Sequence, residues 1–159
     1  MKELGFRAWL VRLPMPPRTR GRLLRRFGAT VGSNVRIHPV TIMDANWSNL
    51  VIENDVYVGP DCILDLSARL TIRRASVLAA GVAVMTHQDA GSSHGSPTAQ
   101  RIGTFVRPVT IGPEAFIGVR AVVLADVGDG SVVGAGAVVV EPSPDHETVV
   151  GIPARTGRP

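Results

Sequence analysis

The sequence predicts an all-β fold in which short parallel strands wind into the stacked coils of a β-helix. Two observations carry this prediction. An aliphatic residue recurs every six positions through much of residues 31–140, and glycine often follows it while a small residue stands fifth. A short internal period of this kind is typical of solenoids. An amphipathic helix needs apolar residues at spacings of three and four, and these six-residue units (called sixes below) do not have that spacing.

The positions within each six have distinct expected roles. First-position aliphatic side chains should point inward, while the strands hydrogen bond to the coils above and below. The fifth residue must be small because three such side chains converge inside a narrow prism. Glycine in second position suits a corner that needs either a positive φ or a close backbone approach. The sixes begin at Val31, Ile52, Val58, Leu64, Ile72, Leu78, Ile111, Ile117, Val127 and Val133.

The six-residue repeat is interrupted in three places. It resumes two residues late at Ile72, stops at Val84 before an excursion over residues 88–108, and is two residues short between Val123 and Val127. The regular part suffices for about five coils, more than the roughly three units that a repeat array needs. Long excursions from a regular scaffold are usually functional or disordered.

The flanks do not follow the repeat. Residues 1–28 are expected to form a short helical cap with Leu23, Leu24 and Phe27 on one side and arginines on the other, because solenoid ends need covering. A membrane-surface helix is the weaker alternative for this segment. The transferase domain then spans residues 29–156, and residues 148–155 are expected to leave the repeat.

Composition limits the functional classes. The net charge is +4, and five arginines crowd the N-terminal segment. They are interpreted as solvated charge or as attraction to an anionic cofactor, membrane or nucleic acid, although no nucleic-acid motif is present. The single cysteine, Cys62, allows no internal disulfide. No apolar run is long enough to span a bilayer and no signal peptide is evident, so a cytoplasmic location is expected.

Several stretches resemble the hexapeptide-repeat acyltransferases, in particular the sugar and polysaccharide O-acetyltransferases. The resemblance covers about residues 29–156 and implies a left-handed β-helix. It also implies acetyl transfer from acetyl-CoA to a hydroxyl of a sugar, polysaccharide precursor or similar small molecule, in a homotrimer with active sites between subunits. No metal is implied, and an amine acceptor or a longer acyl chain stays open. The stretches are residues 36–39, 47–56, 85–89, 108–112 and 149–155.

His87 is the predicted catalytic residue. It stands where the repeat stops, and similar transferases carry their general base at this junction. A neutral imidazole can take the proton of the acceptor hydroxyl as that oxygen attacks the thioester. His94 lies deeper in the excursion, whereas His38 and His146 are expected at the surface or at corners. Cys62 occupies a fifth-position slot and is expected in the core.

The resemblance also suggests acceptor-binding residues. Asp44, Asp61 and Asp65 fall where related sugar acetyltransferases place such groups, and one of the three is a candidate for orienting His87. The alternative is that Asp61 and Asp65 are ordinary corner residues. Phe116 stands where related enzymes often have a tryptophan beside the substrate, which leaves the acceptor open.

The resemblance further implies a coenzyme A site. Gly118, Ala135 and Ala137 would line the pantetheine arm, and the coil around Gly118 would supply donors for the oxyanion. Guanidinium groups suit phosphate, so Arg155 is expected to contact it, while Arg158 is left open. The residues expected to meet the nucleotide are Gly151, Ile152, Pro153, Ala154 and Arg155.

Two rival functions remain at the sequence level. A γ-class carbonic anhydrase-like metal enzyme uses the same scaffold, but its zinc needs three histidines that converge across a subunit interface. Only His87 and His94 are near each other in the sequence. A non-catalytic β-helix scaffold is the second rival. The His-bearing excursion and the Gly-Ile-Pro-Ala-Arg ending at residues 151–155 argue against it.

Overall fold

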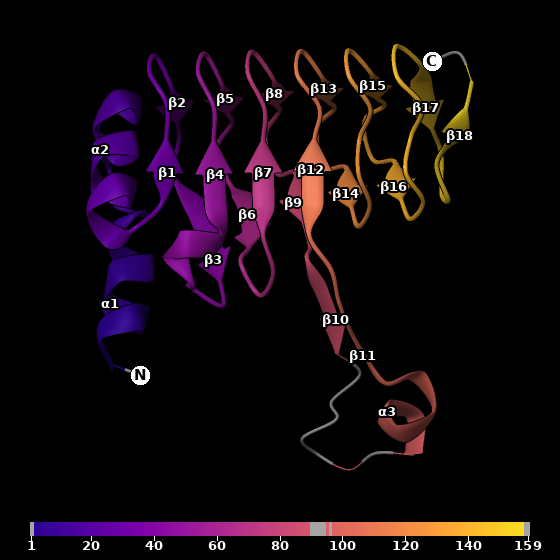
Figure 1. Cartoon of the computed structure of the whole chain (residues 1–159), viewed down its shortest axis with the longest axis horizontal. Coiled ribbons are helices and arrows are strands. Elements are labelled where there is room, and N and C mark those ends of the chain that lie inside the picture. Colours follow the sequence, from indigo (N-terminus) through magenta and orange to yellow (C-terminus); the bar gives the residue numbers. More distant parts are fainter. Residues whose placement is uncertain (1, 90–94, 96, 158–159) are drawn as a thin grey trace.

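The predicted β-helix is present in the computed structural model, which describes residues 2–89, 95 and 97–157. Three sheets of short parallel strands form the three sides of a prism, and successive coils lie side by side along its axis (Figure 1). Each of the first four coils contributes one strand to each side in turn. In the described residues the chain passes through five coils and begins a sixth, as the six-residue period predicts.

The strands of each side follow one another at coil spacing. The first side contains β1 (Thr30–Val31), β4 (Leu50–Ile52), β7 (Leu70–Ile72) and β12 (Val109–Ile111). The second contains β2 (Arg36–Ile37), β5 (Tyr57–Val58), β8 (Val77–Leu78), β13 (Phe116–Ile117), β15 (Val132–Val133) and β17 (Thr148–Val150). The third contains β3 (Val40–Met43), β6 (Cys62–Asp65), β9 (Ala83–Val84), β14 (Val122–Val123) and β16 (Val138–Val139).

The core is the interior of the prism. First-position side chains such as Val58, Leu78 and Ile117 are fully buried one above another, since β5, β8 and β13 pair in register. Fifth-position residues are buried as well. Ser76 is a polar example, and its hydroxyl lies 2.7 Å from the carbonyl of Arg73 in its own corner and 2.8 Å from that of Gly112 in the next coil, either of which can accept its proton. A core built of these small residues accounts for the low aromatic content.

The glycine in second position is required by close backbone approach and not by a positive φ. A Cβ on Gly112 would lie 2.7 Å from the backbone nitrogen of Asp129 in the next coil. Positive φ angles belong instead to the fourth position, for example Asp61 at 59° and Glu114 at 60°. The corner therefore has two separate steric requirements, one between coils and one within the turn.

Two helices cover the N-terminal end of the prism. They are α1 (Lys2–Leu10) and α2 (Pro17–Phe27), and α2 ends at Gly28 with φ 112°. Leu24 is fully buried, and Leu23 and Phe27 pack against the core. This arrangement agrees with the predicted helical cap. Neither helix, nor any other in the described residues, is long and apolar enough to cross a bilayer.

One arginine of the cap departs from the expected surface location. Arg20 is fully buried, and its guanidinium donates to the carbonyls of Val11 at 2.7 Å, Leu13 at 2.7 Å and Ile37. The end of a helix leaves carbonyls without partners, and the five N–H groups of arginine can satisfy several at once. Arg20 is therefore a structural residue and does not contribute to a free basic surface.

The described residues of the excursion after Val84 form an arm. Its base is an antiparallel pair, β10 (His87–Asp89) with β11 (Thr104–Val106), and α3 (Pro97–Ile102) lies further out. Figure 1 shows the arm projecting from the side of the prism. The chain then re-enters the first side at β12.

The prediction that residues 148–155 leave the repeat is wrong in part. β17 still belongs to the second side, because Val149 pairs in parallel with Val133. Only after Gly151 does the chain turn back, and β18 (Arg155–Thr156) then pairs antiparallel with β17. Valine at positions 149 and 150 continues the inward and outward alternation of a strand, which explains why the coil extends so far.

The three interruptions of the period lie along one edge of the prism, where the third side meets the first. This edge holds η1 (Trp47–Asn49) in the first coil, residues 66–69 in the second and the arm in the third. In the fourth coil it is short, and the chain rejoins the first side only through the Ile111–Val127 bridge. We call this the irregular edge. It positions the candidate site.

Substituting Gly112 by alanine should destabilise the protein by about 2 kcal/mol, because the methyl group is forced into the backbone of the next coil. Urea unfolding followed by circular dichroism measures the change. Gly136→Ala is the matched control, since Gly136 has φ 67° and a Cβ there would meet no atom within 4 Å, so only turn strain is added. An equal or smaller loss for Gly112→Ala would contradict the inter-coil explanation.

Candidate active site

The irregular edge brings together residues that are far apart in the sequence. Met43 pairs with Asp65, and Leu64 pairs with Val84, so the ends of β3, β6 and β9 lie on successive coils. The residues at and after these strand ends therefore converge. The clustered candidates are Asp44, Asp65 and His87, whose side chains each bring a nitrogen or oxygen atom within 4.8 Å of the others.

Asp65 and His87 form a close pair. The Nδ1 atom of His87 lies 2.7 Å from Oδ2 of Asp65, whose side chain is fully buried. The same oxygen accepts the backbone N–H groups of Thr86 at 2.7 Å and His87 at 2.8 Å, and the Thr86 hydroxyl at 2.9 Å. A carboxylate oxygen at this distance assigns the ring proton to Nδ1. The lone pair of Nε2 is then available to accept a proton.

Asp65 stays ionised in this environment. Burial alone would raise its pKa, but hydrogen bonds from Ser67, His87 and Thr86 outweigh burial and lower the pKa to about 2. The pair therefore holds a full negative charge beside the imidazole over the whole neutral range. Such a charge fixes the orientation of the ring and stabilises the imidazolium that forms when Nε2 takes a proton.

Ser67 links the pair to Asp44. Its Oγ lies 2.7 Å from Oδ1 of Asp65, 2.6 Å from Oδ2 of Asp44 and 2.7 Å from Nδ1 of His87. The hydroxyl has one proton and can donate it to only one of the two carboxylates at a time. Asp44 is exposed, and its Oδ2 lies 3.8 Å from Nδ1 of His87. Ser67 thus sets the spacing between a buried and an exposed carboxylate.

Ser67 and Thr86 were not predicted from the sequence. Both are polar residues beside the irregular edge, and Ser67 lies in the stretch where the period runs two residues late. The two extra residues before Ile72 were the signal in the sequence that this corner could hold functional residues, since extra residues at a corner need not follow the aliphatic pattern. Thr86 meets Asp65, and Ser67 meets Asp44 and His87, only across coils. The contact between Ser67 and Asp65 is the local one.

Asp61 and Phe116 do not join this group. Asp61 precedes β6 at the edge between the second and third sides, whereas Asp65 ends the same strand. In the described residues Asp61 has no hydrogen bond to the His87 network. Phe116 lies on the second side and is 44% exposed. Their assignment to the acceptor stays a prediction.

A cleft beside Asp44 offers room for an acceptor. It has a volume of about 620 Å³ and reaches the exposed Asp44 carboxylate. The buried Trp47 indole N–H, on a residue that lines the cleft, has no hydrogen-bond partner in the described residues. The residues lining the cleft are Phe27, Gly28, Asp44, Ala45, Asn46, Trp47 and Ser48.

The predicted pantetheine residues occupy a different edge of the same prism. Gly118 and Ala135 lie at successive corners between the second and third sides, and the Ala137 side chain is buried in the core. The N–H of Gly118 already donates to the carbonyl of Val133 at 2.8 Å. This N–H group therefore already has a hydrogen-bond acceptor within the prism. That the coil containing Gly118 supplies a donor for the oxyanion stays a prediction.

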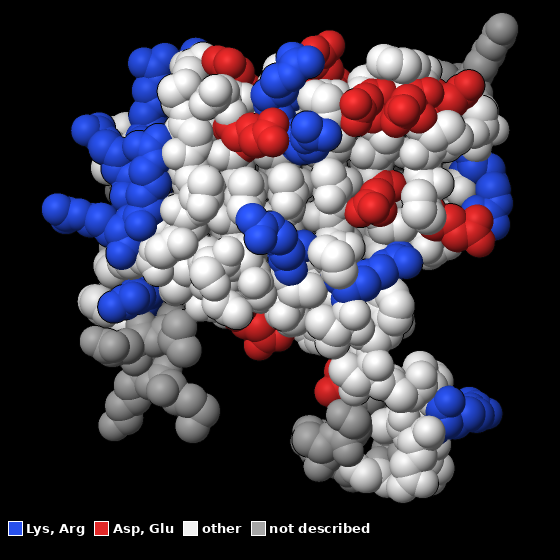
Figure 2. Space-filling model, viewed as in Figure 1, with Lys and Arg blue, Asp and Glu red and all other residues white. Residues whose placement is uncertain are grey.

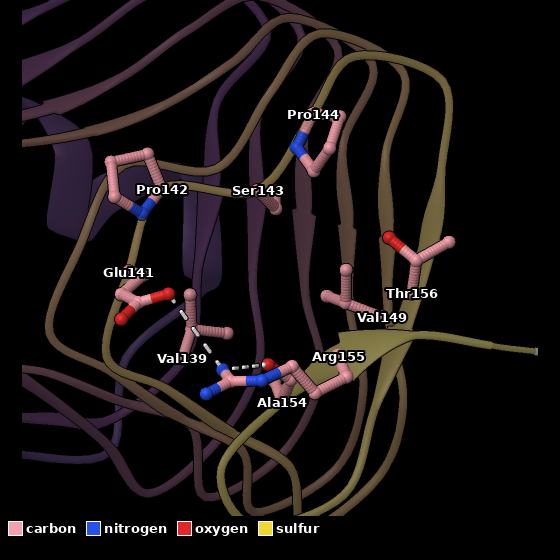
Figure 3. Close-up of a pocket in the computed structure, with 9 residues that line it drawn as sticks. All are labelled: Val139, Glu141, Pro142, Ser143, Pro144, Val149, Ala154, Arg155 and Thr156. Carbon is pink, nitrogen blue, oxygen red and sulfur yellow. Dashed lines mark hydrogen bonds and ion pairs between the residues drawn. The ribbon is translucent and has the colours of Figure 1, made fainter.

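Ala154 and Arg155, from the ending at residues 151–155, line a separate small pocket of about 110 Å³, shown in Figure 3. Residues 151–153 of the same ending are exposed at the turn between β17 and β18. Arg155 points toward Glu141, with its Nη1 3.9 Å from Oε2 of Glu141 and 2.9 Å from the Ala154 carbonyl (Figure 3). Phosphate binding by Arg155 stays a prediction. Arg158 lies outside the described residues.

The remaining histidines and the cysteine lie elsewhere. His38 lies beside Tyr57 with ring centroids 5.3 Å apart, and His146 is exposed at a corner. His94 lies outside the described residues. Among the described residues of this single chain, no three histidines lie together. Cys62 is buried, and burial raises the pKa of its thiol to about 11.

Comparison with known proteins shows the family of this chain. Residues 108–141 match the family model described as the hexapeptide repeat of succinyl-transferase. The chain is 32% identical over 140 residues to the putative colanic acid biosynthesis acetyltransferase of Escherichia coli K12, a match that covers 86% of this chain and 72% of that protein. The chain belongs to the hexapeptide-repeat acetyltransferases. This membership makes it an acyltransferase.

Solved structures agree on the fold of the family. A maltose O-acetyltransferase from Clostridium difficile 630 superposes with a TM-score of 0.80 at 23% identity, over 99% of this chain and 84% of that one. A galactoside acetyltransferase in complex with coenzyme A gives a TM-score of 0.78 at 23% identity, over 98% of this chain and 78% of that one. The predicted left-handed β-helix is thereby confirmed.

Replacing Asp65 by asparagine should change how the stability of this acetyltransferase depends on pH. The pKa of Asp65 is lowered on folding, so its contribution is complete above the unfolded-state pKa and is lost as pH falls toward about 2. The stability gap between wild type and Asp65→Asn should therefore shrink by about 2 kcal/mol between pH 5 and pH 2. Urea unfolding at several pH values measures it.

Asp61→Asn is the control for this experiment. Asp61 has the same side chain on the same coil, but it is exposed and lies outside the network. The stability gap between wild type and Asp61→Asn should change less over this pH range than the gap for Asp65→Asn, because the Asp61 side chain accepts none of the hydrogen bonds of the network. A constant gap for Asp65→Asn would show that the buried carboxylate is not held ionised by its donors.

Cys62→Ala tests the alternative of a covalent thiol intermediate. A buried thiol with a raised pKa supplies almost no thiolate at neutral pH, so the variant should transfer acetyl groups at the wild-type rate. Thiol release from acetyl-CoA measures the rate. Loss of turnover in a variant that unfolds at the wild-type temperature would make Cys62 a nucleophile.

Proposed function

We propose that the chain transfers the acetyl group of acetyl-CoA directly to a hydroxyl of a sugar, polysaccharide precursor or similar small molecule, with His87 as general base. The observation that carries this proposal is the Asp65–His87 pair at the irregular edge, in which Nδ1 lies against the carboxylate, so that in the neutral ring Nε2 is the nitrogen that can accept a proton. The sugar acetyltransferases among the similar proteins support the acceptor class, and the coenzyme A complex among them supports the donor.

The chemistry follows from the orientation of the ring. Nε2 takes the hydroxyl proton as the acceptor oxygen forms its bond to the thioester carbonyl carbon. The negative charge of Asp65 stabilises the imidazolium through Nδ1–H. When the tetrahedral intermediate collapses, the carbon–sulfur bond breaks and the proton passes from Nε2 to the departing thiolate of coenzyme A. The ring is then neutral again.

The acceptor approaches through the cleft beside Asp44. The exposed carboxylate of Asp44 is an acceptor for sugar hydroxyls, and Asn46 and Ser48 add further polar groups to a lining that is otherwise largely apolar. Because Ser67 ties Asp44 to the catalytic pair, a hydroxyl bound at Asp44 lies close to the imidazole. Asp65 itself is fully buried, so its role is to orient His87 and not to contact the acceptor.

Assembly into a homotrimer would complete the site. The pantetheine residues and His87 lie on different edges of one prism, so a donor groove between neighbouring chains would join the two edges. The arm supports such a contact because it exposes the apolar side chains of Ile102, Phe105 and Val106. The cytoplasmic location expected from the sequence stays part of this proposal.

His87→Ala should lower kcat by about 10²–10⁴, the usual contribution of a general base. Affinity for coenzyme A should be kept, because the ring contacts the reacting oxygen and not the nucleotide. Thiol release gives kcat, and calorimetry gives the affinity. His38→Ala is the matched control and should keep wild-type turnover, since His38 lies beside Tyr57 and away from the irregular edge. Turnover of His87→Ala near that of wild type would remove His87 from the mechanism.

The acceptor class is tested by thiol release with panels of sugars, amino sugars and amino acids. Turnover with hydroxyl acceptors that is lost in His87→Ala supports the proposal. Turnover with amine acceptors alone would replace O-acetylation by N-acetylation at the same site. Absence of acetyl-CoA binding at millimolar concentration would favour a non-catalytic scaffold.

A further inference from the structure

The charges of this chain are separated along the axis of the prism. Residues 1–28 contain Lys2 and seven arginines against one acid, Glu3, whereas residues 110–150 contain six acids against one arginine, Arg120. Figure 2 shows the basic side chains gathered over the N-terminal helices and acidic ones over the later coils. Such a distribution orients the molecule in an external field, with its N-terminal end toward negative charge.

Several arginines of the cap are free to meet a partner. Arg20 and Arg25 are occupied by backbone carbonyls of the chain itself. Arg12, Arg22 and Arg26 are exposed, and none of them takes part in an ion pair within the described residues. We call these three residues the basic cap surface. They carry three charges at one end of the prism that have no ion-pair partner among the described side chains.

Two aromatic side chains are exposed at the same end. Phe6 is 60% exposed and Trp9 is 55% exposed, and their rings stack with centroids 6.1 Å apart. They lie on α1, which packs against β3, and Val11 directly after this helix enters the core. Two neighbouring large aromatic rings on a surface indicate an interaction site, since each ring gains free energy by leaving water.

We propose that the N-terminal end of the prism docks on the surface of an anionic lipid bilayer. The basic cap surface would meet the headgroup phosphates, and Phe6 and Trp9 would enter the boundary between headgroups and acyl chains. Arginines beside aromatic rings are the combination that interfacial helices use. The rings sit on an outer helix face and not along a basic groove, which favours a bilayer over a nucleic-acid strand.

Docking in this orientation has a consequence for the acceptor, which rests on the proposed function. Phe27 and Gly28, at the end of α2, line the cleft beside Asp44. A docked α2 would hold this cleft close to the bilayer, where an acceptor attached to a lipid could enter it. Membrane docking itself is measured without acetyl-CoA or acceptor, so its failure is distinguishable from failure of acetyl transfer.

The experiment is co-sedimentation of the full chain with vesicles of phosphatidylcholine, with and without about 30% phosphatidylglycerol. Wild type should bind the anionic vesicles, and high salt should weaken the binding. Arg22→Glu with Arg26→Glu should weaken binding by about 30-fold or more, since two basic contacts are lost. Phe6→Ser with Trp9→Ser should weaken binding as well, and salt should release this variant more completely than wild type, because only charge contacts remain.

Arg36→Glu with Arg69→Glu is the matched control. Both residues are exposed on the body of the prism, and the pair changes the net charge by the same amount. This variant should keep most of the binding to anionic vesicles. Circular dichroism and thiol release with a soluble acceptor should be unchanged in the Arg22 and Arg26 variant, because neither residue belongs to the site.

Four results would overturn the proposal. They are failure of wild type to bind anionic vesicles, equal losses in the matched control, tighter binding to single-stranded RNA with the same residue dependence, and a changed oligomeric mass as the only effect of the Phe6 and Trp9 variant. The last result would assign the aromatic pair to a contact between copies of the chain.

Discussion

Backbone hydrogen bonding between coils is the constraint on which this structure depends. Each short strand has its partners in the coils before and after it, so the register of one coil fixes that of the next. Extra residues can be accommodated only at corners. Residues 44–49, residues 66–69 and the arm all do so at one edge, and the stacking of these longer corners gathers Asp44, Ser67 and His87.

Much of the fold was predictable because its determinants are local. Aliphatic residues at intervals of six, small fifth residues and a helical cap specify a prism without knowledge of any long-range contact. The position of His87 at a departure from the scaffold was predictable for the opposite reason, since the repeat stops there. For glycine in second position the sequence predicted two alternative reasons, a positive φ or a close backbone approach. It could not decide between them, because the position of the next coil cannot be read from a single six-residue unit.

The rest of the site depends on contacts between coils and was harder to predict. Asp61 and Asp65 belong to one short stretch, and only the strand between them decides that one carboxylate is buried beside His87 and the other is exposed. Ser67 and Thr86 gain their roles from partners about one coil away in the sequence. Arg20 likewise looks like any surface arginine until its carbonyl partners are known.

The two ends of the prism are closed by different devices. At one end α2 packs on the first coil, and the guanidinium of Arg20 donates to the carbonyl of Ile37 in that coil. At the other, β18 runs antiparallel to β17, so the outermost strand has the wrong polarity to extend a parallel sheet. A solenoid with open ends would present a template for another solenoid. Both ends of this prism are covered by an element that does not continue the parallel coils, an arrangement that disfavours end-to-end stacking of prisms.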